Sequence, residues 1–133
     1  MPARKRRDTN AKSELVLQLS PSSLMVGQAR RAVGEFCRSG KHASLAEDAE
    51  LLTSELMTNA CRYSTGLVTV LALTNVAGVV VTVTDDDGGE PLVSVEQDLE
   101  RDSGRGLFLV DAIAGAWGTT AHDGGKSVWF RLP

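Results

Sequence analysis

Several features that would assign this chain to a broad class are missing. No apolar run approaches the roughly 20 residues that span a bilayer, so no membrane segment is expected. The two cysteines, Cys37 and Cys61, form no CxxC pair, which is typical of reduced thiols in a cytoplasmic protein. The basic start, MPARKRRDTNAKSE, lacks the apolar core of an export signal. A net charge of −3 argues against direct binding of nucleic acid.

Two widespread nucleotide-binding motifs are absent as well. The sequence has neither the GxxxxGK[ST] spacing of a phosphate-binding P-loop nor GxGxxG after a strand. What is present is the composition of an ordinary globular protein, with 42% apolar and 23% charged residues in 133. We expect a flexible basic arm over residues 1–13 and one domain over residues 14–133.

Hydrophobic periodicity predicts the secondary structure of this domain. The order is β-α-α-β-β-α-β-β, with a long lid-like loop over residues 86–104 before the third helix. The predicted strands are 14–20, 67–74, 78–85, 117–122 and 127–133, and the predicted helices are 22–38, 45–63 and 105–116. Because hairpin connections dominate, the sequence predicts an α+β fold: a two-layer α/β sandwich. Its mixed sheet is mostly antiparallel, and three helices lie on one face.

The stretch ELMTNACRYS places polar residues inside the second predicted helix. At helical spacing, Glu55, Asn59 and Arg62 fall on one stripe beside an apolar stripe, at the border of the buried face. A boundary salt bridge would account for such a stripe, and so would a binding site.

A second candidate is the stretch SGRG, which directly precedes the third predicted helix. Gly104 and Gly106 permit close approach of a ligand to the backbone, and Arg105 adds a cation. The free N–H groups at a helix start suit phosphate oxygens.

Four segments in this order resemble the GHKL ATP-binding superfamily, whose fold is the Bergerat or histidine-kinase-like ATPase fold. ELMTNACRYS resembles its N-box, DDDGGEP its first glycine box, SGRGLFLVDAIAGAWG its second, and GGKSVWFRLP its closing strand. The resemblance covers about residues 14–133. It is strongest to the small single-domain branch, the anti-sigma-factor serine/threonine kinases.

The resemblance implies roles for the candidate residues. Asn59 is implied as the ligand of a Mg²⁺ ion that bridges the ATP phosphates, and Glu55 as the general base that accepts a proton from a substrate hydroxyl. The remaining N-box and second-glycine-box positions are expected to bind nucleotide: Arg62, Gly104, Arg105, Gly106 and Leu107.

The residue that accepts a hydrogen bond from the adenine amino group is less clear. The family pattern Asp-x-Gly favours Asp86 before Gly88, whereas strand alternation points Asp85 at the core, so both stay open. Ser127 is expected near this aspartate. Lys126, by contrast, is expected to serve only the turn before the last strand.

The function implied by the resemblance is a Mg-ATP-dependent serine/threonine protein kinase that acts as an anti-sigma factor. Its expected partners are a sigma factor and an anti-anti-sigma protein with a STAS domain, which it would phosphorylate to regulate transcription. Relatives commonly form homodimers. The alternative is an ATP-binding interaction module that switches partner affinity without phosphotransfer.

Overall fold

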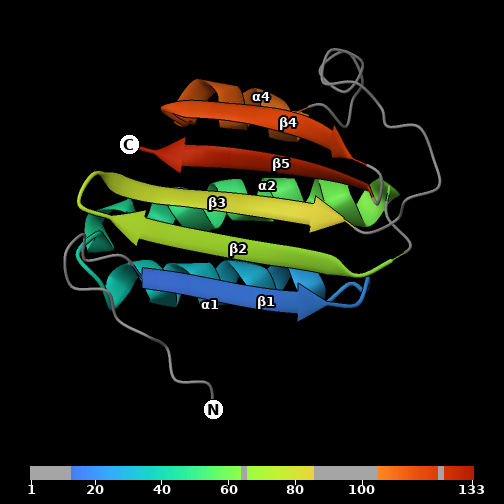
Figure 1. Cartoon of the computed structure of the whole chain (residues 1–133), viewed down its shortest axis with the longest axis horizontal. Coiled ribbons are helices and arrows are strands. Elements are labelled where there is room, and N and C mark those ends of the chain that lie inside the picture. The colour runs from blue at the N-terminus through green and yellow to red at the C-terminus, as the bar shows by residue number, and fades with distance from the viewer. Residues whose placement is uncertain (1–12, 64–65, 86–104, 123–124) are drawn as a thin grey trace.

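The computed structural model describes residues 13–63, 66–85, 105–122 and 125–133, and five strands in these ranges form one sheet (Figure 1). The strand order across the sheet is β1-β2-β3-β5-β4, and every neighbouring pair is antiparallel. The strands are β1 (Ser13–Leu19), β2 (Val68–Asn75), β3 (Gly78–Asp85), β4 (Ala116–His122) and β5 (Gly125–Leu132). The predicted sheet is confirmed.

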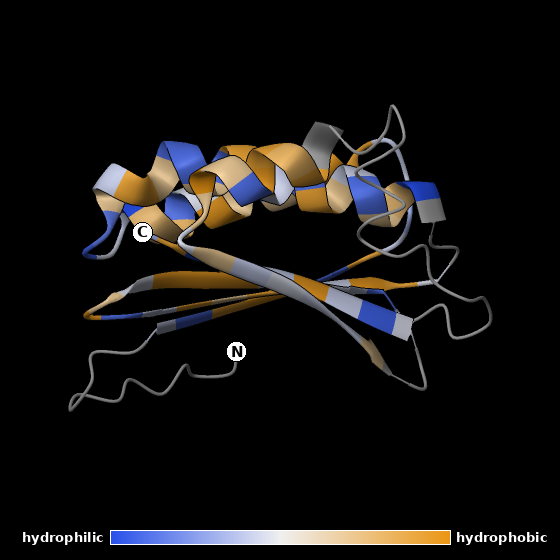
Figure 2. Cartoon of the chain, turned by 90° about the horizontal axis from the view of Figure 1, so that it is seen from above, coloured by the Kyte–Doolittle hydropathy of each residue, from blue (hydrophilic) through white to orange (hydrophobic). Residues whose placement is uncertain are grey.

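Within the described ranges, three α-helices form a layer over one face of this sheet, as Figure 2 shows. They are α1 (Met25–Arg38), α2 (Ala46–Tyr63) and α4 (Arg105–Ile113), and a short 3₁₀ turn, η1 (Ala43–Leu45), precedes α2. The helix α2 packs against both α1 and α4. The predicted two-layer sandwich, with its three helices on one face, is therefore confirmed. None of the helices that the structure describes is long and apolar enough to cross a membrane.

The core lies between the two layers and follows from the alternation of the strands. In β3, Val79, Val81 and Val83 are buried, while the residues between them are only partly buried. From α2, Leu52 and Leu56 close the same core at helical spacing. Full burial of each such side chain contributes about 1.5–3 kcal/mol relative to exposure.

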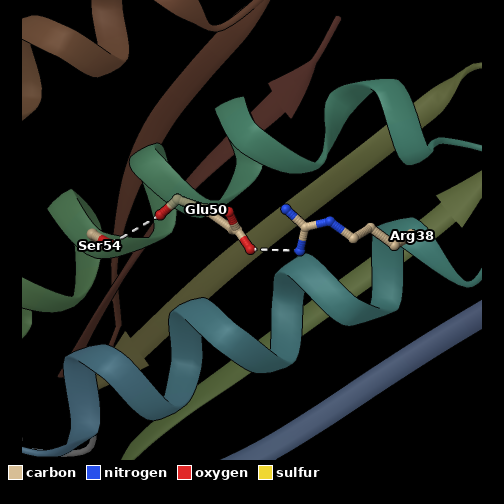
Figure 3. Close-up of polar contacts among 3 residues, drawn as sticks. All are labelled: Arg38, Glu50 and Ser54. Atoms are coloured by element: carbon tan, nitrogen blue, oxygen red, sulfur yellow. Dashed lines mark hydrogen bonds and ion pairs between the residues drawn. The ribbon is translucent and has the colours of Figure 1, made fainter.

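Helices α1 and α2 meet at an ion pair that lies over a glycine. A side chain at Gly34 would collide with the Glu50 carboxylate, so glycine leaves room for this carboxylate against α1. Arg38 Nη1 donates a hydrogen bond to Glu50 Oε2 at 2.7 Å, and Ser54 Oγ donates to the Glu50 backbone oxygen at 2.9 Å (Figure 3). The bridge is partly exposed and adds little stability, but it fixes which side of α2 faces α1.

Several element boundaries differ from the predicted ones by one to three residues, and two of these differences have a clear physical cause. Helix α4 ends at Ile113 rather than at residue 116, because the Gly115 amide donates to the Arg131 oxygen at 2.8 Å and so turns the chain onto the sheet. Strand β5 begins at Gly125 rather than at residue 127. Gly125 has a φ of +146°, a conformation that residues with a side chain rarely adopt.

Candidate functional site

Helix α2 has two sides with different polar residues. Glu50 faces α1 through its contact with Arg38. The separation between positions 50 and 59 is about two and a half helical turns, so Asn59 lies on the opposite side of α2, toward α4. The predicted stripe of Glu55 and Asn59 is therefore placed along the edge of α2 that faces α4, next to the apolar core.

The environments of Asn59 and Glu55 suit a polar ligand better than a structural role. Asn59 is 8% exposed, and its amide makes no hydrogen bond to the residues that the structure describes. The amide is not fully withdrawn from solvent, because Thr53 Oγ1 is the only fully buried side-chain polar atom without a partner in the described ranges. The Asn59 amide oxygen is therefore open to a ligand. Glu55 is partly buried and, within the same described ranges, has neither an ion pair nor a hydrogen bond.

The carboxyl end of β3 supplies the third group. Asp85 continues the buried row of Val81 and Val83 and is only 3% exposed, so its side chain lies on the helix-facing side of the sheet. Strand alternation therefore places Asp85 correctly. Asp86 and Gly88, which the family pattern favours, lie outside the described residues, as does Gly104.

The start of β5 approaches Asp85 closely because position 125 is a glycine. A side chain at Gly125 would collide with the backbone oxygen of Asp85, and its Cβ would lie 2.8 Å from Asp85 Oδ1. Together with its φ of +146°, this makes position 125 a glycine requirement. Position 125 therefore keeps the start of β5 close against the Asp85 carboxylate.

Helix α4 points its N-terminus toward the same end of the molecule. Its C-terminal end is tied to the far end of β5 by the bond from Gly115 to Arg131. Over its 9 residues the helix runs about 13 Å, back toward the end where β5 starts and β3 finishes. The backbone of Arg105 and Gly106 opens this helix, so its free N–H groups lie at that end.

The connections show that Asn59 shares this end. Helix α2 finishes at Tyr63, a short link before Val68, and Val68 is the register partner of Asp85. In Figure 1 the last turns of α2, the end of β3, the start of β5 and the start of α4 all lie toward the right. The fold thus brings the N-box residues, Asp85 and the start of α4 together at one end of the sandwich.

Other predicted residues are placed differently. Ser127 lies on the sheet face away from the helices, where its hydroxyl and that of Thr84 are 2.7 Å apart and share a hydrogen bond. Asp85 lies on the helix-facing side, so the two side chains point to opposite faces. Leu107 is 3% exposed and belongs to the hydrophobic core. Arg62 is exposed in the last turn of α2.

One residue that the sequence analysis assigned to a turn is part of the site. Lys126 is the register partner of Asp85 and is only 6% exposed. The signal was available: Val128, Phe130 and Leu132 alternate on the buried face, and extending that row backward reaches position 126. It was missed because the predicted strand began one residue too late to include it.

Comparison with protein families agrees with this geometry. The family model for the histidine kinase-like ATPase domain matches residues 20–132, which is nearly all of the chain. The chain belongs to this family. Comparison with curated proteins finds no match. Histidine kinase-like ATPase domains bind ATP, usually with Mg²⁺, so the resemblance to the GHKL superfamily is confirmed at the level of the ATP-binding domain.

The residues present fit such a nucleotide. Asp85, buried at the end of β3 beside Gly125, carries a carboxylate that could accept a hydrogen bond from the adenine amino group. The buried Asn59 amide offers a hard oxygen of the kind that Mg²⁺ accepts from proteins. The start of α4 presents backbone N–H groups suited to phosphate oxygens.

Proposed function

We propose that this histidine kinase-like ATPase domain is a Mg-ATP-dependent serine/threonine protein kinase. It acts as an anti-sigma factor that phosphorylates a STAS-domain anti-anti-sigma protein and so regulates transcription. The family supports the ATP-binding part of this proposal. The specific reaction is supported by the resemblance of the N-box to the anti-sigma-factor kinases and by the state of Glu55.

The observation that carries the kinase assignment is the Glu55 carboxylate, which has no partner among the residues that the structure describes. It lies about one helical turn from Asn59 on the same edge of α2, and within the described ranges no cation or donor engages it. A carboxylate that stabilised the fold would resemble Glu50, which has Arg38. A general base instead needs free acceptor oxygens within reach of the proton that it removes.

Each residue then has a defined task. Bound Mg-ATP supplies a transferable phosphoryl group whose charge the metal partly neutralises. The Asn59 carbonyl oxygen would hold the metal, and Asp85 would accept a hydrogen bond from the adenine amino group. Glu55 would accept the proton of the substrate serine hydroxyl. The backbone N–H groups at the start of α4 bind phosphate oxygens.

The decisive experiment is transfer of label from γ-labelled ATP to a STAS-domain protein encoded near this chain. We expect label on a serine of the STAS protein in the presence of Mg²⁺, and none when the metal is chelated. Tight Mg-ATP binding without any transfer would support the non-catalytic switch instead. A sigma factor added as competitor is expected to bind the ATP-loaded form.

The remaining partner assignments follow the same proposal. A sigma factor and a STAS-domain protein are the proposed partners, in the cytoplasm, and we propose in addition that the chain forms a homodimer. Light scattering of the purified chain, alone and with the sigma factor, gives the stoichiometry directly. A monomer that binds no sigma factor would contradict the homodimer and the sigma-factor assignment while leaving the nucleotide site intact.

A further inference from the structure

Lys126 is a lysine in an unusual place. Lysine is among the residues least often buried, because removal of an ammonium group from water is costly unless it is compensated. Here Lys126 is 6% exposed and lies at the start of β5, directly opposite Asp85 on β3. Lys126 has an interaction partner in the structure, which compensates its burial, and its position opposite Asp85 is what makes it a candidate for ligand recognition.

The register puts the two side chains on the same face. Lys126 continues the buried row of Val128 and Phe130, just as Asp85 continues that of Val83. Directly opposed residues in an antiparallel pair have Cβ atoms about 4.5–5.5 Å apart. A hydrogen-bond acceptor and a hydrogen-bond donor of opposite charge are thus adjacent on the helix-facing side of the sheet, at the end that holds Asn59.

A carboxylate acceptor beside an ammonium donor complements the hydrogen-bonding edge of adenine. Adenine carries an exocyclic amino group, a donor, flanked by ring nitrogens that are acceptors. A carboxylate that accepts from the amino group leaves the neighbouring ring nitrogen for an ammonium donor. Guanine has an oxygen acceptor in place of the amino group, so the same carboxylate would face an acceptor and reject it.

We propose that Lys126 is a second residue that recognises the adenine base. Asp85 accepts a hydrogen bond from the amino group, and Lys126 donates one to the ring nitrogen beside that amino group. This rests on the proposed nucleotide site and assigns the specificity of that site to two residues on neighbouring strands. The flexible four-carbon side chain of lysine lets the ammonium reach past the end of the strand, whereas the Lys126 backbone stays fixed in the sheet.

A purely structural role makes a different prediction. If Lys126 only offset the charge of Asp85, its removal would weaken binding of every adenine nucleotide equally, whichever ring nitrogen is present. If Lys126 contacts the base, its removal weakens the binding only of those nucleotides that retain the contacted ring nitrogen. Analogues that lack one ring nitrogen, 1-deaza-ADP and 7-deaza-ADP, separate these cases.

The experiment is calorimetric titration of ADP and the two analogues, with Mg²⁺, into the full chain and its variants. Wild type is expected to bind ADP about tenfold or more tightly than one of the analogues, as for loss of a hydrogen bond to a charged donor. Lys126→Met is expected to lose that preference, and Lys126→Arg to keep part of it. Lys41→Met is the matched control, because Lys41 is exposed, and should behave as wild type.

The outcomes are distinguishable. Equal affinity of wild type for all three nucleotides overturns the role of Lys126 and leaves the nucleotide site standing. So does a Lys126→Met variant that keeps the wild-type preference. A wild-type chain that binds no adenine nucleotide overturns the proposed function and this inference together. Should Lys126→Met fail to fold, the wild-type analogue series and Lys126→Arg still decide the question.

Discussion

The two sides of α2 carry glutamates in opposite circumstances. On the side facing α1, Glu50 accepts a hydrogen bond from Arg38 at 2.7 Å, and this contact holds the pKa of the Glu50 carboxyl below its usual value. On the edge facing α4, Glu55 is partly buried and has no such partner among the described residues. One helix therefore uses one acid to fix its packing and leaves another available for chemistry.

This comparison also separates two kinds of polar burial. Glu50 and Arg38 satisfy each other and remain partly exposed, so their pairing is a packing device with a small energetic effect. Asn59, on the other side, is nearly buried without a hydrogen-bond partner in the described ranges. Its amide is therefore open to a ligand, whereas the Glu50 carboxylate is already engaged by Arg38.

The largest expected effect is on catalysis. Glu55→Gln should reduce phosphotransfer to the STAS protein about 10²- to 10⁴-fold, because it removes the proton acceptor while it keeps the shape of the side chain. Affinity for Mg-ADP should be unchanged. Glu50→Gln is the matched control and should leave the transfer rate intact. Equal rates for wild type and Glu55→Gln, measured by label transfer, would remove Glu55 from the reaction.

Next comes nucleotide affinity. Asn59→Ala should weaken Mg-ADP binding about 10- to 100-fold, since it deletes the metal-binding amide. Ser54→Ala, on the α1-facing side of the same helix, should bind as wild type does. Titration calorimetry with and without Mg²⁺ measures both. An Asn59→Ala variant with wild-type affinity would show that the metal is held elsewhere.

A third test concerns a buried hydroxyl on the core side of α2. Thr53 is fully buried, and its Oγ1 has no hydrogen-bond partner in the part of the chain that the structure describes. Thr53→Val replaces the hydroxyl by a methyl group of similar shape and should stabilise the fold by about 1 kcal/mol. Urea unfolding at neutral pH measures the change. A destabilised variant would reveal a partner for this hydroxyl.

A smaller effect on stability is expected from glycine-to-alanine substitutions in α1, on the side that packs against α2. Gly27→Ala should stabilise α1 by about 0.5–1 kcal/mol through helix propensity, since a Cβ there meets only ordinary contact. Gly34→Ala should gain less, because the new methyl group displaces the Glu50 carboxylate. In a Glu50→Ala background the full gain should return. Equal gains at both glycines in the wild-type background would contradict this reading.

The smallest effect is the pH dependence of the Arg38–Glu50 pair. Arg38 lowers the folded-state pKa of Glu50. The pair therefore contributes to stability above the unfolded-state pKa of about 4.3, and this contribution is lost as the pH falls below that value. The stability difference between wild type and Arg38→Gln should therefore be small at neutral pH and vanish in acid. Urea unfolding across this range checks the sign, and a difference that grew in acid would refute it.

Much of the fold followed from local pattern. Alternation in residues 78–85 predicted β3 to the residue, and the short link after residue 74 predicted the β2–β3 hairpin. The same alternation placed Asp85 on the buried side, where the structure finds it, although the family pattern favoured the next aspartate. Local rules fail at element ends, as at α4 and β5, because tertiary contacts such as Gly115 to Arg131 decide where a helix stops.

The sequence by itself determined the elements, the two-layer class and the N-box edge of α2, since periodicity sets which side chains share a face. Only the tertiary structure decided that β5 lies beside β3, because strand order depends on contacts between segments far apart in the chain. That neighbour relation buries Lys126 against Asp85 and gathers β3, β5, α2 and α4 at one end. A site that is built from four separate segments can be recognised only in the folded chain.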